Sequence, residues 1–113
     1  MVELVGAAEF TDWFLDLSKA DATAVARVIG YLEERGVALG IPYSSAISGN
    51  HRYAFRELRI QSRGHPLRGL YVFDRRRQAV LLVGGDKTGN DRFYQQLIPQ
   101  AERVWEEYLA ETS

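Results

Sequence analysis

Five consecutive apolar residues at positions 79–83 (Ala-Val-Leu-Leu-Val) are the feature that most constrains the fold of this chain. Successive side chains of a β-strand point to opposite faces of the sheet, so an uninterrupted apolar run predicts a strand buried on both faces. Glycines at 84, 85 and 89 predict a loop directly after the run. We therefore expect a central strand over residues 78–83, covered on both sides.

The first third of the chain has helical periodicity. It predicts a helix over residues 7–17 and a second helix that is capped by Asp21 and ends at Gly36. The short link between them predicts an antiparallel helical hairpin. The apolar residues that recur at helical spacing in the first helix are Phe10, Trp13, Phe14 and Leu17.

The rest of the sequence predicts β-strands followed by a C-terminal helix. Strands are expected over residues 52–60 and 68–74, with a loop before them at 40–49 and turns at 61–66 and 74–77. A last helix can be capped by Asn90 or Asp91; it starts later if Pro99 lies in its first turn, and otherwise Pro99 must kink it. The sequence thus predicts one α+β domain over residues 1–113, with the helical hairpin packed on a small, strongly twisted antiparallel β-sheet and a C-terminal helix.

The composition excludes several classes of protein. The 113 residues contain no cysteine, which excludes disulfides and thiolate metal sites. No basic stretch followed by an apolar run opens the chain, and no apolar segment approaches the roughly 18 residues that span a membrane. We therefore expect no secretory signal, no membrane partner and a cytoplasmic location.

Charge is distributed unevenly along the chain, although the net charge is only −1. Residues 51–92 carry 10 basic and 4 acidic side chains, whereas residues 1–50 carry 3 and 7. Nine of those ten basic residues are arginine, whose planar guanidinium matches a phosphate. Local potential rather than net charge attracts a polyanion, so this segment is the predicted contact surface. The alternative is an ordinary charged, solvated face of a sheet.

Three kinds of site find little support. The Gly-Gly-Asp-Lys-Thr stretch at 84–88 is not a phosphate-binding loop, because that motif requires glycine where this chain has Leu81. His51 and His65 are the only histidines, and neither has a carboxylate at helical ligand spacing. No glycine-flanked serine elbow is present. We expect neither a metal nor another cofactor.

A set of basic and aromatic residues remains along the predicted sheet and the loop after it. Cations can neutralise phosphates and aromatic rings can stack on unpaired bases, which is how single-stranded RNA is commonly bound. Alternatively, nearby acids pair with several of these cations, and the register across the 61–66 turn decides whether Arg59 and Arg68 share a face. The set comprises Arg56, Arg59, Arg63, Arg68, Tyr71, Lys87, Arg92 and Tyr94.

Three segments in this order resemble successive strands of RelE/ParE-superfamily toxins, and most of all the phage Gp49-like, HigB-type branch. They are residues 55–59 (Phe-Arg-Glu-Leu-Arg), 67–73 (Leu-Arg-Gly-Leu-Tyr-Val-Phe) and 81–87 (Leu-Leu-Val-Gly-Gly-Asp-Lys). Residues 98–103 and 107–109 are similar to that branch's last helix. The resemblance implies a RelE-like fold and a type II toxin that cleaves mRNA in the ribosome. The implied partners are the ribosome, mRNA and an antitoxin, often a helix-turn-helix protein.

The implied chemistry requires no metal: the 2′-hydroxyl attacks the adjacent phosphate and leaves a cyclic phosphate and a free 5′-hydroxyl. By resemblance, Arg68 stabilises the phosphorane, Lys87 lies near the leaving group, and Tyr94 positions or stacks the substrate. Arg59 grips phosphate or ribosomal RNA. RelE has a lysine base where this chain has Glu57, so the base is either Glu57 or His65, whose turn would have to fold over the site.

Two other functions stay open at this point. The ParE branch shares the fold but inhibits DNA gyrase by binding it, and the arginines would then form a protein-docking surface. A catalytically silent homologue would bind its partner without arresting growth.

Overall fold

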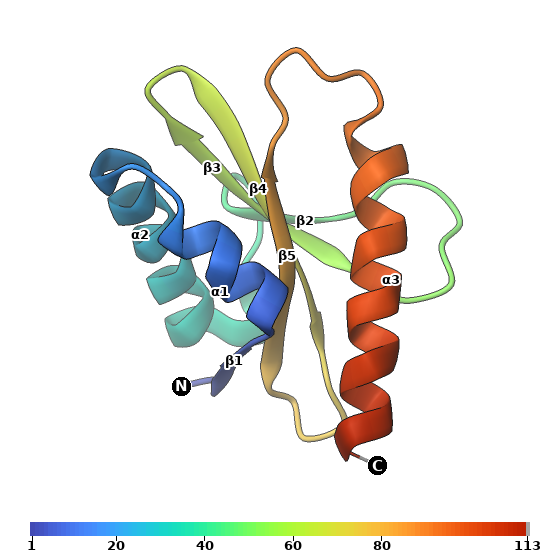
Figure 1. The fold of residues 1–113 in the computed structure, drawn as a ribbon. Helices are drawn as coiled ribbons and strands as arrows, with labels where there is room; N and C mark the ends of the chain where they lie inside the picture. The colour runs from blue at the N-terminus through green and yellow to red at the C-terminus, as the bar shows by residue number, and fades with distance from the viewer. Residues whose placement is uncertain (113) are drawn as a thin grey trace.

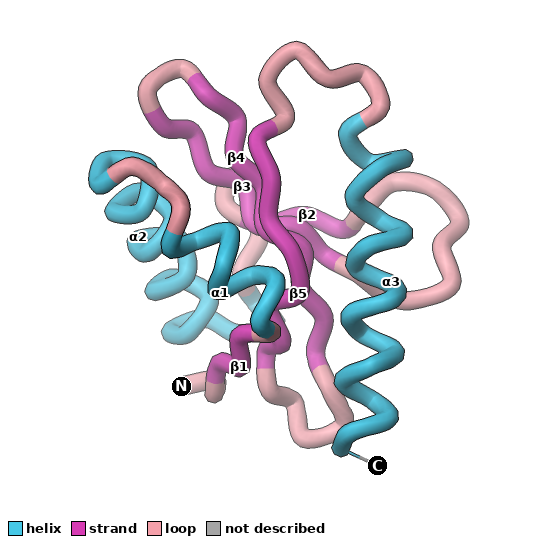
Figure 2. Tube along the Cα trace, in the orientation of Figure 1, coloured by secondary structure: helices cyan, strands magenta, loops and turns pink. Residues whose placement is uncertain are grey.

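The computed structural model describes residues 1–112 and confirms an α+β fold. A helical hairpin covers one face of a twisted five-stranded sheet and a long C-terminal helix covers the other (Figure 1). The strands lie in the order β1-β5-β4-β3-β2, with β1 parallel to β5 and the other pairs antiparallel (Figure 2). The elements in chain order are β1 (Leu4–Gly6), α1 (Ala8–Leu15), α2 (Lys19–Arg35), the 3₁₀ turn η1 (Gly36–Ala38), β2 (Ser44–Ala46), β3 (Arg56–Ser62), β4 (His65–Phe73), β5 (Ala79–Asp86) and α3 (Phe93–Thr112).

The apolar run forms β5 in the interior of the sheet, and it is buried on both faces as predicted. Leu81 belongs to a core shared with α1 and α2, whereas Val80 and Leu82 belong to a second core shared with α3. Both cores therefore depend on one strand, because its side chains alternate between the two faces.

The loop predicted to begin at Gly84 is wrong, because β5 continues to Asp86. A Cβ atom on Gly84 would lie 2.2 Å from a ring carbon of Trp13, and one on Gly85 would lie 2.8 Å from a ring carbon of Phe93. The two glycines therefore allow aromatic rings from α1 and α3 to pack directly on the strand from opposite faces. Their role here is close approach rather than chain reversal.

Several helix ends differ from the prediction, and α1 ends at Leu15 rather than at residue 17. Ser18, not Asp21, caps α2, since the Ser18 hydroxyl accepts a hydrogen bond from the Asp21 amide at 3.2 Å. Gly36 ends α2 with φ +54°, as predicted. The last helix starts later than Asn90, and Pro99 lies within it beyond the first turn.

The hairpin between β3 and β4 is tighter than the predicted six-residue turn. Arg63 and Gly64, with φ of +50° and +79°, form its two-residue bend. Such a bend matches the twist of the strands on either side and sets their register. The predicted loop at 40–49 contains β2, a short edge strand that pairs with β3. Within residues 1–112, no helix combines the length and the apolar character needed to cross a membrane.

Candidate active site

The register of the β3–β4 hairpin brings Glu57 and Arg68 together on the sheet face that α3 covers. Arg59 pairs directly with Arg68, and Glu57 lies two residues before Arg59 on the same side of β3. The Arg68 Nε atom lies 3.5 Å from Glu57 Oε1, and both side chains are buried, with 8% and 9% of their surfaces exposed. The two charged side chains therefore form a buried ion pair at the sheet surface.

Three side chains from three elements hold the Glu57 carboxylate. Tyr94, in the first turn of α3, donates its hydroxyl to Oε1 at 2.6 Å, and Ser45 of β2 donates to Oε2 at 3.2 Å. Arg68 adds the positive charge beside Oε1. Because partners fix both oxygens, the carboxylate has a defined orientation.

The environment of Tyr94 keeps its phenol protonated. Burial raises the pKa of the Tyr94 hydroxyl above its usual value of 10.0, and the hydrogen bond to Glu57 raises it further, while Arg68 acts in the opposite direction. The phenol is therefore neutral at physiological pH and remains a hydrogen-bond donor.

The Arg68 guanidinium retains unused donor capacity. Its Nη1 atom donates to the Leu67 carbonyl at 3.1 Å. Its buried Nε has no hydrogen bond to any described residue, since the contact with Glu57 at 3.5 Å is an ion pair only. A buried N–H without a partner destabilises a protein by about 1–3 kcal/mol, and a catalytic role is one of the reasons for which native proteins retain such a group.

A cavity of about 590 Å³ opens beside this cluster. Lys87, from the segment after β5, lines it with its ammonium 5.2 Å from the centroid of the Tyr94 ring. Arg59 lines it as well and also borders a smaller hollow of about 320 Å³ that reaches Arg68. The cavity wall comprises Ser45, Ala46, Ile47, Ser48, His51, Glu57, Arg59, Lys87, Tyr94, Gln95, Ile98 and Pro99.

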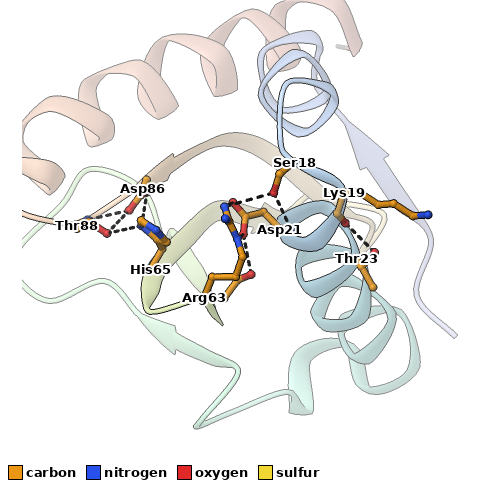
Figure 3. Close-up of polar contacts among 9 residues, drawn as sticks. Ser18, Lys19, Asp21, Thr23, Arg63, His65, Asp86 and Thr88 are labelled. Atoms are coloured by element: carbon orange, nitrogen blue, oxygen red, sulfur yellow. Dashed lines mark hydrogen bonds and ion pairs between the residues drawn. The ribbon is translucent and has the colours of Figure 1, made fainter.

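Two predicted residues lie at the tips of the sheet instead, as Figure 3 shows. Arg63 forms an ion pair with Asp21 of α2, with a closest N–O distance of 3.0 Å. His65 Nδ1 lies 3.3 Å from an oxygen of Asp86 and 3.3 Å from the Thr88 hydroxyl. Neither residue lines the cavity, and the turn that carries His65 does not fold over it.

Arg56, Tyr71 and Arg92 also lie apart from the cluster. Tyr71 is completely buried on the opposite sheet face, where its hydroxyl lies 2.6 Å from that of Ser44 and 3.4 Å from Arg56 Nε. Its ring has no free face for a base to stack on. Arg92 is exposed just before α3 and does not line the cavity.

Sequence reasoning overlooked two polar residues of the cavity wall. Ser45 belongs to the edge strand that was taken for a loop, and no local pattern marks it. His51 was considered only as a metal ligand, yet it lines the cavity with its Nε2 atom 2.6 Å from the Ser48 carbonyl oxygen. Only the path of the loop between β2 and β3 brings it there.

No cluster of three or more histidine, aspartate or glutamate side chains that could hold a metal ion occurs in the part of the chain that the structure describes. The cavity wall contains one carboxylate, that of Glu57, surrounded by cations and hydrogen-bond donors. This combination suits an anionic ligand better than a cation.

Comparison with known proteins places these residues in context. Residues 12–106 match the family model described as "Phage derived protein Gp49-like (DUF891)". The chain is 38% identical over 99 residues to "Putative toxin HigB3" of Mycobacterium tuberculosis, a match that covers 87% of this chain and 85% of the relative. It is 35% identical over 101 residues to "Putative toxin HigB2" of the same organism, covering 88% of this chain but 50% of that relative. No solved structure gave a significant match.

Proposed function

The chain belongs to the Gp49-like, HigB-type toxin family, and from this premise we propose that it is the toxin of a type II toxin–antitoxin system. We propose further that it acts in the cytoplasm as a metal-independent endoribonuclease that cleaves mRNA on the ribosome and so stops translation. The observation that carries the proposal is the buried Glu57–Arg68 pair, joined to Tyr94 beside a cavity that Lys87 lines.

Each step of RNA cleavage has a candidate group in this cluster. Glu57 accepts the proton of the attacking 2′-hydroxyl, since it is the carboxylate in the cavity wall. The oxygen then attacks phosphorus, and Arg68 stabilises the added negative charge on the phosphorane. Lys87 donates a proton to the departing 5′-oxygen. The products are a 2′,3′-cyclic phosphate and a free 5′-hydroxyl.

Tyr94 and Arg59 are assigned to substrate binding. The neutral Tyr94 phenol orients Glu57, and its ring lines the cavity, where a base can pack against it. Arg59 is exposed between the cavity and the neighbouring hollow, where it can hold a flanking phosphate. His65 has no assigned part in the chemistry, because Asp86 and Thr88 hold it outside the cavity.

Inducible expression in a bacterium tests this proposal. Wild type is expected to arrest growth and to create new 5′ ends in translated mRNA. Lys87→Ala and Glu57→Gln should lose both effects, while Arg27→Ala, an exposed arginine on α2, should retain them. Purified protein should reproduce the cleavage with ribosomes and leave 2′,3′-cyclic phosphate ends, which form when the 2′-hydroxyl attacks and not when a metal-activated water does.

The other outcomes would reassign the protein. Growth arrest with intact mRNA and inhibited supercoiling would indicate a gyrase inhibitor. Absence of arrest from a folded, expressed protein would indicate a silent homologue. A cognate antitoxin, often a helix-turn-helix protein in this branch, would place acidic side chains against Arg59 and Lys87, and co-expression should then restore growth.

A further inference from the structure

A second basic surface lies at the turn between β4 and β5. Arg75, Arg76 and Arg77 follow one another there, and all three are exposed. None of them forms an ion pair with a carboxylate of the described chain. Three adjacent, unpaired guanidinium groups repel one another, so internal packing gives no reason to collect them.

Asp74, the acidic residue of this turn, accepts hydrogen bonds from backbone amides and forms no ion pair with the arginines. Asp74 Oδ1 accepts hydrogen bonds from the amides of Arg76 at 2.9 Å and Gln78 at 2.8 Å, and its Oδ2 accepts the Tyr108 hydroxyl at 2.9 Å. The Arg77 amide in turn donates to the Asp74 carbonyl at 2.9 Å. These hydrogen bonds hold the turn. Glu3 lies beside the turn, but its carboxylate accepts a hydrogen bond from Gln78 at 3.0 Å and forms no ion pair with Arg76 or Arg77.

The arginines point to different sides of this turn. Arg75 and Arg76 line a hollow of about 500 Å³ against the end of α3, whereas Arg76 and Arg77 line another of about 480 Å³ against the N-terminal residues. Arg77 has φ +62°, a conformation that a non-glycine residue adopts only when its surroundings impose it. The turn is thus a convex wedge with cations on both flanks.

The wedge is remote from the candidate active site. In Figure 1 it lies at the lower end of the sheet, near the C-terminus, whereas Lys87 follows the upper end of β5. Arg68 and Phe73 are separated by five residues along β4, or roughly 16 Å at about 3.3 Å per residue. One phosphate cannot contact both Arg68 and the wedge.

We propose that the Arg75–Arg77 turn is a docking surface for the backbone of double-helical RNA, separate from the cleavage site. The inference rests on the proposed function, because it names a structured RNA that holds the protein while the cavity receives single-stranded mRNA. A convex turn with guanidinium groups on both flanks complements two phosphate rows bordering a groove, and arginine forms bidentate contacts with phosphate. Double-helical RNA is recognised largely through its shape and its phosphates.

A binding assay separates this inference from catalysis. The probe is a labelled RNA duplex of about 20 base pairs, and the variant is R75Q/R76Q/R77Q. The matched control, K19Q/R27Q/R35Q, removes the same charge from exposed positions on α2. The turn variant should bind about tenfold more weakly at ~50 mM salt, and its log–log salt dependence should be shallower by about 2–3, whereas the control should stay near wild type.

Three results would overturn the inference: equal loss in both triple variants, no loss in the turn variant, or displacement of the duplex by polyglutamate as efficiently as by unlabelled RNA. The last would indicate an acidic protein partner. The double variant R75Q/R76Q keeps Arg77, whose positive φ makes it the position most sensitive to substitution. It should fold as wild type does and should lose part of the affinity for the duplex. Lys87→Ala should bind the duplex normally even if it no longer cleaves, so failure of the proposed nuclease and failure of this surface are distinguishable.

Discussion

Replacing Arg68 by alanine should destabilise the fold as well as abolish cleavage. The substitution leaves the Glu57 carboxylate buried without its cation, although Tyr94 and Ser45 still donate hydrogen bonds to it. Breaking a buried ion pair by removing one partner costs about 3–5 kcal/mol. The two remaining hydrogen bonds place Arg68→Ala at the lower end, near 3 kcal/mol, which is a large share of the roughly 5–15 kcal/mol that stabilises a typical domain.

Urea and thermal unfolding followed by tryptophan fluorescence measure this effect. Trp13 and Trp105 lie in different cores, so coincident transitions of the single-tryptophan variants Trp13→Phe and Trp105→Phe will test two-state behaviour. For a domain of this size, about 3 kcal/mol corresponds to a fall in Tm of roughly 10–15 °C. Lys87→Ala removes no ion pair of the described chain but loses the cation–π contact with Tyr94, so it should lower the free energy of unfolding by about 0.5–1 kcal/mol.

The double variant Glu57→Gln/Arg68→Ala completes the test. It removes both charges, so it should be less destabilised than the sum of the single variants by about 1–2 kcal/mol. A cost below about 1 kcal/mol for Arg68→Ala, or strict additivity in the double variant, would refute the reasoning that the pair is buried and coupled. Growth arrest lost in Lys87→Ala, with a fall in Tm much smaller than that of Arg68→Ala, would then be the cleaner evidence for catalysis.

Close packing at Gly84 and the shifted pKa values of Asp21 and Tyr94 each lead to a measurable effect. Gly84→Ala should lower the free energy of unfolding by about 3 kcal/mol, because its Cβ would overlap the ring of Trp13. Gly30→Ala in α2, where the new Cβ would have nothing within 4 Å, should raise it by about 0.5–1 kcal/mol. Chemical denaturation measures both changes. The pKa of Asp21 is lowered to about 2 from 3.8, chiefly by Arg63, so its stabilising effect is present above pH ~4 and is lost as the pH falls toward 2. The acid limb of a Tm–pH curve should therefore be flatter in Asp21→Asn. The raised pKa of the Tyr94 phenol contributes stability below pH ~10 that is lost at higher pH, so Tyr94→Phe should remove one late-titrating phenol from an absorbance titration at alkaline pH.

Local sequence patterns were sufficient to predict which segments form helices and strands. They also predicted that the central strand is covered on both faces. The apolar run in β5 correctly predicted burial on both faces, because alternation of side chains is an intrinsic property of a strand. Gly36 correctly marked the end of α2, since its left-handed φ disfavours other residues. Local patterns failed at Gly84 and Gly85, where glycine accommodates rings contributed by segments distant in sequence.

The sequence was sufficient to select the basic and aromatic residues as candidates, but not to predict which of them contact one another. Arg68 and Tyr94 were recognised through the family resemblance, while the contact of both with Glu57 depends on a two-residue bend that aligns Arg59 with Arg68. A shift of one residue in that register would turn Glu57 toward the opposite core.

The sequence by itself thus determined which elements form, that both sheet faces are covered, and that the central segment is basic; these follow from periodicity, turn residues and charge, which act over a few residues. Only the tertiary structure decided that Glu57 meets Arg68 and Tyr94 beside a cavity that Glu57 and Tyr94 line, that Tyr71 is buried on the other face, and that His65 contacts Asp86 outside the cavity. The physical reason is that these contacts join residues far apart in the chain, and strand register and helix packing select them from many pairings that the same local patterns would allow.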